Sequence, residues 1–121
     1  VRQDRQHLEV CRILWELLMT QKAYLHLVKY ALDLGHNISI HDGGEFQVKN
    51  SQSYKAIKDA IESVDDSEIY IRQPNDDHVG WAYVVLYGNG PEETVSDYGD
   101  NGFMDTWNNT YNALLKEQEN A

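Results

Sequence analysis

The chain has few of the residues that build disulfide frameworks, thiolate metal sites and membrane spans. Its single cysteine, Cys11, excludes an internal disulfide and a multi-cysteine zinc site. No stretch reaches the ~18 apolar residues that a membrane-spanning helix needs. The longest apolar region, residues 10–19, is interrupted by Arg12 and Glu16 and lacks the cleavage site of a signal peptide. We therefore expect a cytoplasmic protein without membrane contact.

Basic residues are scarce in the second half of the chain. From Glu62 onward there are thirteen acidic side chains and only two basic ones, Arg72 and Lys116. Residues 1–61 hold eight basic and seven acidic side chains, so the formal net charge of −10 resides in residues 62–121. A field of this sign repels nucleic acid and anionic lipid, and it favours a protein partner with a basic surface.

The composition predicts one folded domain. A length of 121 residues is enough for one hydrophobic core, and 41% hydrophobic residues is too much for a disordered acidic tail. The chain starts at Val1, and Met19 followed by Thr20 is a plausible native start. We predict a helical extension over residues 1–18, either without functional meaning or part of the working protein, and one domain over residues 19–121.

The pattern of apolar residues predicts an α+β fold. Helical spacing runs through three segments, residues 20–34, 51–64 and 102–118. Alternation predicts four strands, at residues 38–40, 46–48, 69–71 and 80–87. The expected fold is one antiparallel sheet of about four strands, formed by two hairpins and packed by two to three helices. The predicted helix caps are Thr20, Asn50 or Ser51, and Asp100 or Asn101.

The strand over residues 80–87 is apolar on both faces. Its two faces carry Trp81, Tyr83, Val85 and Tyr87 on one side, and Ala82, Val84 and Leu86 on the other. Such a strand is typical of the centre of a sheet that is covered on both sides, or of a subunit contact. The sequence therefore leaves open a homodimer through the Trp81–Tyr87 strand or through the last helix.

Two histidines near a turn could suggest a metal site. His36 and His41 are separated by an odd number of strand positions, so their side chains point to opposite faces. Zinc needs three or four converging ligands, which this region does not supply. We predict no metal and no cofactor, and we retain a small metal-dependent enzyme that uses His41 with Asp42 or Glu45 as an alternative.

Other acidic residues do not form a recognisable catalytic or calcium motif. The segment at residues 97–102 resembles a calcium loop, but Gly99 takes the third position, where an oxygen ligand is required, and Asn108 takes the twelfth, where the loop needs a bidentate Glu. Glu68 and Asp105 lie near apolar stripes, but the pattern does not make them face one another. We therefore predict no catalytic residue.

The acidic residues around the last two strands are the predicted binding site for a partner. They are Asp65, Asp66, Asp76, Asp77, Glu92, Glu93, Asp97 and Asp100, together with Tyr98. If their loops converge, the carboxylates imitate a nucleic-acid backbone and occupy a basic groove. Tyr70, Tyr98, Trp107 and Tyr111 would supply aromatic contacts. The alternative is a solvated exterior, because turns and caps favour Asp for local reasons.

Three segments resemble small uncharacterised proteins encoded by bacteriophages and prophages. They are residues 41–48 (HDGGEFQV), 80–82 (GWA) and 91–98 (PEETVSDY), within residues 19–121. Small acidic phage proteins often inhibit host nucleases, restriction systems or polymerases, and the resemblance implies such a role by analogy. We therefore predict a non-enzymatic decoy that binds a basic surface of a host protein handling nucleic acid, in the host cytoplasm and without binding nucleic acid itself. A self-assembling structural protein is the first alternative.

Overall fold

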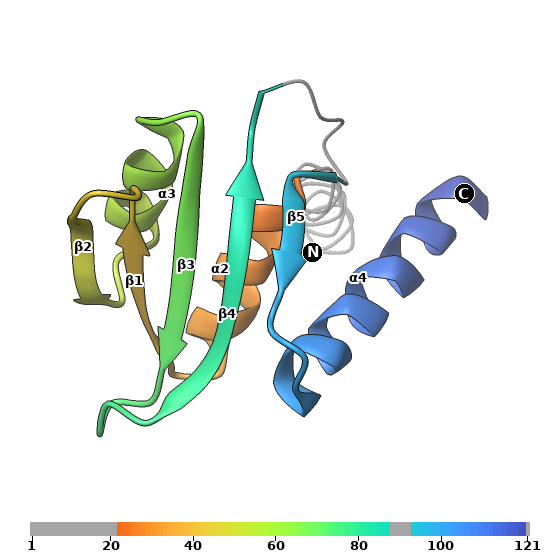
Figure 1. The fold of residues 1–121 in the computed structure, drawn as a ribbon. Coiled ribbons are helices and arrows are strands. Elements are labelled where there is room, and N and C mark those ends of the chain that lie inside the picture. Colours follow the sequence, from red (N-terminus) through yellow and green to blue (C-terminus); the bar gives the residue numbers. More distant parts are fainter. Residues whose placement is uncertain (1–21, 88–92, 121) are drawn as a thin grey trace, which may run out of the picture.

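The protein is an antiparallel sheet with helices packed against one of its faces (Figure 1). The computed structural model describes residues 22–87 and 93–120. In chain order its elements are α2 (Ala23–Asp33), β1 (Asn37–His41), β2 (Phe46–Ser51), α3 (Tyr54–Glu62), β3 (Asp66–Arg72), β4 (His78–Val85), β5 (Val95–Tyr98) and α4 (Gly102–Asn120). This arrangement confirms the predicted α+β fold. None of the described helices is long and apolar enough to cross a membrane.

The sheet has the strand order β2-β1-β3-β4-β5, and every neighbouring pair is antiparallel. The two predicted hairpins, β1–β2 and β3–β4, are present and pair with each other through β1 and β3. The fifth strand, β5, was not predicted. It is short, and the exposed polar residues Ser96 and Asp97 in its middle remove the alternation that marks a strand.

The core lies between the sheet and the helices. Alternate residues of the three central strands point toward the helices and are fully buried, as the sequence predicted for Ile69 and Ile71. The sheet contributes Ile38, Ile40, Ile69, Ile71, Ala82 and Val84, and the helices contribute Leu27, Val28, Ile57, Ile61, Met104 and Trp107. At Gly80 the backbone of β4 approaches α4 so closely that a Cβ atom would lie 2.7 Å from Sδ of Met104.

Polar residues at the helix ends set where each helix begins or stops. The Oγ atom of Ser53 accepts the N–H of Ala56 at 3.3 Å and caps α3, so the predicted cap at Asn50 or Ser51 was wrong. The reason is that β2 continues through Ser51. The Oδ1 atom of Asn101 accepts the N–H of Met104 at 3.0 Å, so one of the two predicted caps of α4 is confirmed. The predicted cap Thr20 lies outside the described residues.

A group of aromatic rings joins α4 to α2 and β5. Trp107 donates its indole N–H to Nδ1 of His26 at 3.0 Å and stacks on Tyr111, with ring centroids 5.8 Å apart. Burial lowers the pKa of His26, which keeps the ring neutral and able to accept this bond. Trp107 and Tyr111 are each only 2% exposed, so these two proposed aromatic contacts are not available on the surface.

Candidate functional site: the open face of the sheet

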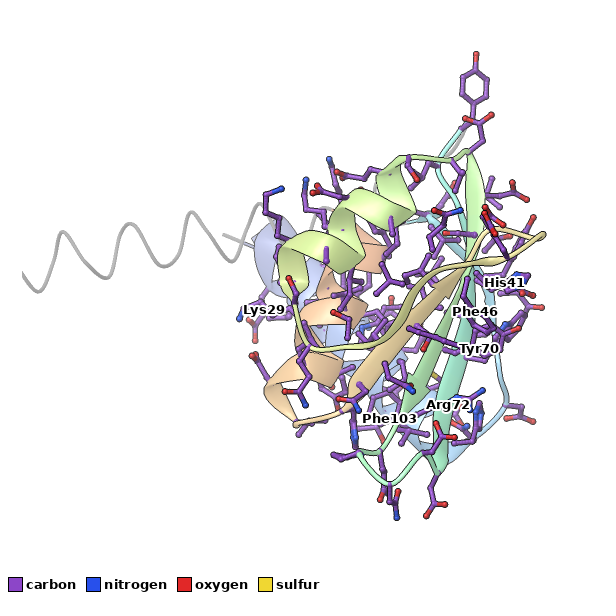
Figure 2. All side chains as sticks on the ribbon, turned by 90° about the vertical axis from the view of Figure 1, so that its left-hand side faces the viewer. Lys29, His41, Phe46, Tyr70, Arg72 and Phe103 are labelled. Atoms are coloured by element: carbon purple, nitrogen blue, oxygen red, sulfur yellow. The ribbon has the colours of Figure 1, made fainter. Side chains whose placement is uncertain are left out.

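The second face of the sheet is not covered by any described helix, and we call it the open face. It carries Asp66, Glu68, Tyr70 and Arg72 of β3, Trp81 and Tyr83 of β4, His41 of β1, Phe46 of β2 and Asp97 of β5. Figure 2 shows His41, Phe46, Tyr70 and Arg72 on the side of the sheet away from the helices. Aromatic rings and carboxylates therefore share one uncovered surface.

The strand pairing places the open-face residues in rows across the sheet. Glu68 lies directly opposite His41 of β1 and Tyr83 of β4, and Tyr83 lies directly opposite Asp97 of β5. In the next row Tyr70 lies opposite Trp81. Directly opposite residues have Cβ atoms about 5 Å apart, so each ring has a carboxylate or another ring as its neighbour.

Both tyrosine hydroxyls of the open face donate hydrogen bonds to carboxylates. Tyr70 donates to Glu68 at 2.9 Å, and Tyr83 donates to Asp66. Burial and the bond to Glu68 raise the pKa of Tyr70, whereas the bond to Asp66 is the main reason that the pKa of Tyr83 is raised. Because Glu68 is two residues from Tyr70 on one strand, about 6.6 Å away, the Tyr70 ring lies along the sheet surface.

Phe46 brings a third ring and a cation to the open face. Its ring meets the edge of His41 at 4.8 Å and the ring of Tyr70 at 6.0 Å between centroids. The Nζ atom of Lys49 lies 5.4 Å from the Phe46 centroid, within the range of a cation–π contact. Phe46 remains 40% exposed. The molecule therefore already places one positive charge over a ring of this face.

Two side chains named in the enzyme alternative, His41 and Asp42, accept hydrogen bonds from the β1–β2 turn. Nδ1 of His41 accepts the N–H of Gly43 at 3.0 Å and lies 3.9 Å from a carboxylate oxygen of Glu68. The carboxylate of Asp42 accepts the N–H groups of Gly44 and Glu45, each at 2.8 Å. These bonds, with one from Gln47, lower the pKa of Asp42 to about 2.

No metal centre is visible in the part of the chain that the structure describes. Within residues 22–87 and 93–120, no three His, Cys, Asp or Glu side chains gather closely enough to hold a metal ion. His36 lies beside Phe103 of α4, with ring centroids 5.5 Å apart, whereas His41 lies on the open face. The two histidines therefore point to opposite faces, as the sequence predicted.

The predicted acidic residues lie at both ends of the strands. Asp65 and Asp66 lie at the start of β3, beside the end of β4, and Glu93 lies close to them because the carbonyl of Thr94 accepts the N–H of Val85. Three further acids, Asp76, Asp77 and Asp100, lie at the opposite end, where β4 begins and the side-chain amide of Asn101 donates to the carbonyl of Val79. A seven-residue strand is about 23 Å long, so these are two separate groups.

Three residues of the predicted site do not belong to either acidic group at the strand ends. Asp97 lies midway along the strands, on the open face, opposite Tyr83. Tyr98 points to the helix side, where its ring meets Trp107 at 6.2 Å. Glu92 lies outside the described residues. Of the predicted acidic set, the structure therefore places Asp66 and Asp97 on one face, with Tyr83 of β4 between their strands.

The sequence analysis did not include Tyr83, Phe46 or Glu68 among the predicted partner-binding residues. A signal was present, because Asp66, Glu68 and Tyr70 occupy alternate positions of one strand and must share a face. No protein-family model, no curated protein and no solved structure matches this chain. We therefore argue the function from the geometry of the open face.

Proposed function

We propose that the protein is a non-enzymatic binding protein that holds a basic surface of another protein on its open face. The observation that carries this proposal is the set of uncovered rings, Phe46, Tyr70, Trp81 and Tyr83, interleaved with the carboxylates of Asp66, Glu68 and Asp97. Aromatic residues are enriched in the centres of protein interfaces, and carboxylates select a partner of opposite charge.

The charge around the open face supports a basic partner. Arg72, the basic residue of β3, already pairs with Asp76 at 3.3 Å, so it does not balance the carboxylates near Tyr83. The two acidic groups add further carboxylates at both ends of β3 and β4. Surfaces that bind the nucleic-acid backbone are basic patches or stripes. We therefore propose a partner of this class, and a decoy role in which the protein competes with nucleic acid.

The proposal is tested by passing a bacterial lysate over the immobilised protein at graded salt. The comparison is with a double variant of the open face, Glu68→Gln with Asp97→Asn. We expect basic nucleic-acid-binding proteins to be retained by the natural sequence at low salt, lost from the variant, released as salt shortens the electrostatic range, and displaced by added DNA.

A matched control removes two acids from the helix side. Asp33→Asn with Asp59→Asn makes the same change in net charge, and both residues are exposed and lie on helices. This control should retain the same proteins as the natural sequence. Identical retention by the open-face variant, or retention that does not depend on salt, would contradict the proposed function.

Self-association through the open face is the second candidate. Trp81, Tyr83 and Val85 are only half-buried although β4 is an inner strand, and Tyr87 just beyond it is 82% exposed. A second copy of the chain would cover these rings, but the carboxylates of the two copies would then repel each other. Light scattering at micromolar concentration decides between them, because a strict monomer removes this candidate.

A further inference from the structure

We infer that Tyr83 is the binding position for one arginine side chain of the partner, whose guanidinium stacks on the ring and bonds the surrounding carboxylates. This inference rests on the proposed function and names the chemical group that the open face recognises. Tyr83 lies on the inner strand β4, half-buried and without a covering element among the described residues.

Tyr83 has a carboxylate on three sides. Glu68 lies directly opposite on β3, Asp97 lies directly opposite on β5, and Asp66 accepts the hydroxyl proton of Tyr83. A cation over this ring would meet the negative face of the π system and the carboxylates at the same time. The ring and the carboxylates therefore form a position that favours a positive group.

The cations that the described chain brings to this face are engaged elsewhere. Arg72 pairs with Asp76, and Lys49 lies over the ring of Phe46 near the β2 edge. Nδ1 of His41 accepts the N–H of Gly43. Within residues 22–87 and 93–120, no basic side chain is therefore placed to balance Asp66, Glu68 and Asp97, and an arginine of a partner would supply that charge.

The arrangement fits arginine better than lysine. A guanidinium is planar, stacks on an aromatic face and carries five N–H donors in one plane, so it reaches carboxylates on more than one side of a ring. A lysine ammonium is a compact, strongly hydrated point charge and has no planar group that could stack on the ring. The partner should therefore present an arginine where it meets Tyr83.

Nuclear magnetic resonance of the full chain tests this inference with three glycine-flanked pentapeptides, which carry arginine, lysine or citrulline at the centre. We expect the arginine peptide to shift the amide signals of Tyr83, Glu68 and Asp97, with binding at least about fivefold weaker for lysine and undetectable for citrulline. Tyr83→Leu and Asp97→Asn should each weaken arginine binding at least about fivefold. Tyr87→Leu, which changes an exposed tyrosine outside the site, should not.

Asp97 is an exposed residue of an edge strand, so its variant keeps the test valid if Tyr83→Leu does not fold. Equal binding of arginine and lysine, shifts confined to other regions, or full binding by either variant would overturn the inference. If the lysate experiment succeeds while the peptide fails at Tyr83, only this inference is lost. If the peptide binds Tyr83 while no basic protein is retained, the arginine site stands and the proposed function falls.

Discussion

The two faces of the sheet carry similar aromatic residues in different surroundings. On the helix side, the rings of Trp107, Tyr111 and Tyr98 pack on one another and on His26, and they hold α4 in place. On the open face, the hydroxyls of Tyr70 and Tyr83 bond to carboxylates and no described element covers the rings. The comparison teaches that aromatic content alone does not mark a binding surface, since the rings of the helix side are structural.

Replacing a tryptophan on each side of the sheet, Trp107 or Trp81, should give the largest difference in the free energy of unfolding between the two faces. Trp107→Ala removes a side chain that is 2% exposed, together with its bond to His26, and should lower the free energy of unfolding by about 3–5 kcal/mol. Trp81→Ala removes a half-buried ring of the open face and should cost clearly less. Urea denaturation followed by circular dichroism measures both. Equal losses would show that Trp81 is as structural as Trp107.

Two glycines test how tightly each side of the sheet is packed. In Gly80→Ala the new methyl group would lie 2.7 Å from Sδ of the buried Met104 and 3.1 Å from the ring of Phe103, so we expect a loss of about 1–3 kcal/mol. In Gly99→Ala the nearest atom, the carbonyl oxygen of Trp81, would lie at 3.9 Å. That change should stay within about 0.5 kcal/mol. A tolerated Gly80→Ala would contradict the close contact between β4 and α4.

The pH dependence of stability tests the bond between α2 and α4. Burial lowers the pKa of His26 in the folded protein, so the unfolded chain binds the proton more readily. The contribution of the neutral ring is complete above its unfolded pKa, about 6.5, and is lost as the pH falls toward the lowered folded value. Each unit of lowering corresponds to about 1.4 kcal/mol.

Denaturation between pH 8 and pH 5 measures this loss, and two variants identify its source. His26→Gln keeps an acceptor for the indole of Trp107 but does not titrate, so its stability should vary less over this range. His78→Gln, at an exposed residue of β4, should follow the natural sequence. If His26→Gln keeps the full pH dependence, the burial of the His26 ring is not its cause.

Local patterns predicted the fold to the extent that each element is periodic. The strand β3 and the helix α3 could be predicted because burial on one side repeats at the period of each element. The strand has Ile69 and Ile71 at alternate positions, and the helix has Ile57 and Ile61 one turn apart. The strand β5 lacks such a repeat, and its polar residues are held by pairing with β4. Pairing between distant segments is decided by the whole sheet, so local propensity could not reveal it.

The candidate site was predicted only in part for the same reason. Alternation along β3 places Glu68 and Tyr70 on one face, which the sequence can show. The position of Asp97 opposite Tyr83 depends on the pairing of β5 and on the irregular register that follows Tyr83. The separation of Asp66 from Asp76 was open to prediction, because residues at the two ends of one strand cannot converge.

Two tyrosines, one on each side of the sheet, donate a hydrogen bond to a glutamate, and removing their hydroxyls should give the smallest difference in the free energy of unfolding between the two faces. Tyr24, 3% exposed on the helix side, donates to Glu62 at 2.6 Å, and Tyr70 on the open face donates to Glu68 at 2.9 Å. Tyr24→Phe should cost about 1 kcal/mol of unfolding free energy, because Glu62 keeps its bond to Lys58. Tyr70→Phe should cost less, because water can replace the hydroxyl at Glu68.

Denaturant midpoints of the two Phe variants provide the measurement, and the expected ranking follows from the two faces. If the Tyr70 hydroxyl only orients its own ring and the Glu68 carboxylate for a partner, it contributes more to binding than to the free energy of unfolding. Tyr70→Phe should therefore leave stability nearly unchanged while it weakens retention of basic proteins at low salt. A loss at Tyr70 that equals or exceeds the loss at Tyr24 would show that the pairs of the open face serve the fold, and the open face would then lose its main distinction from the core.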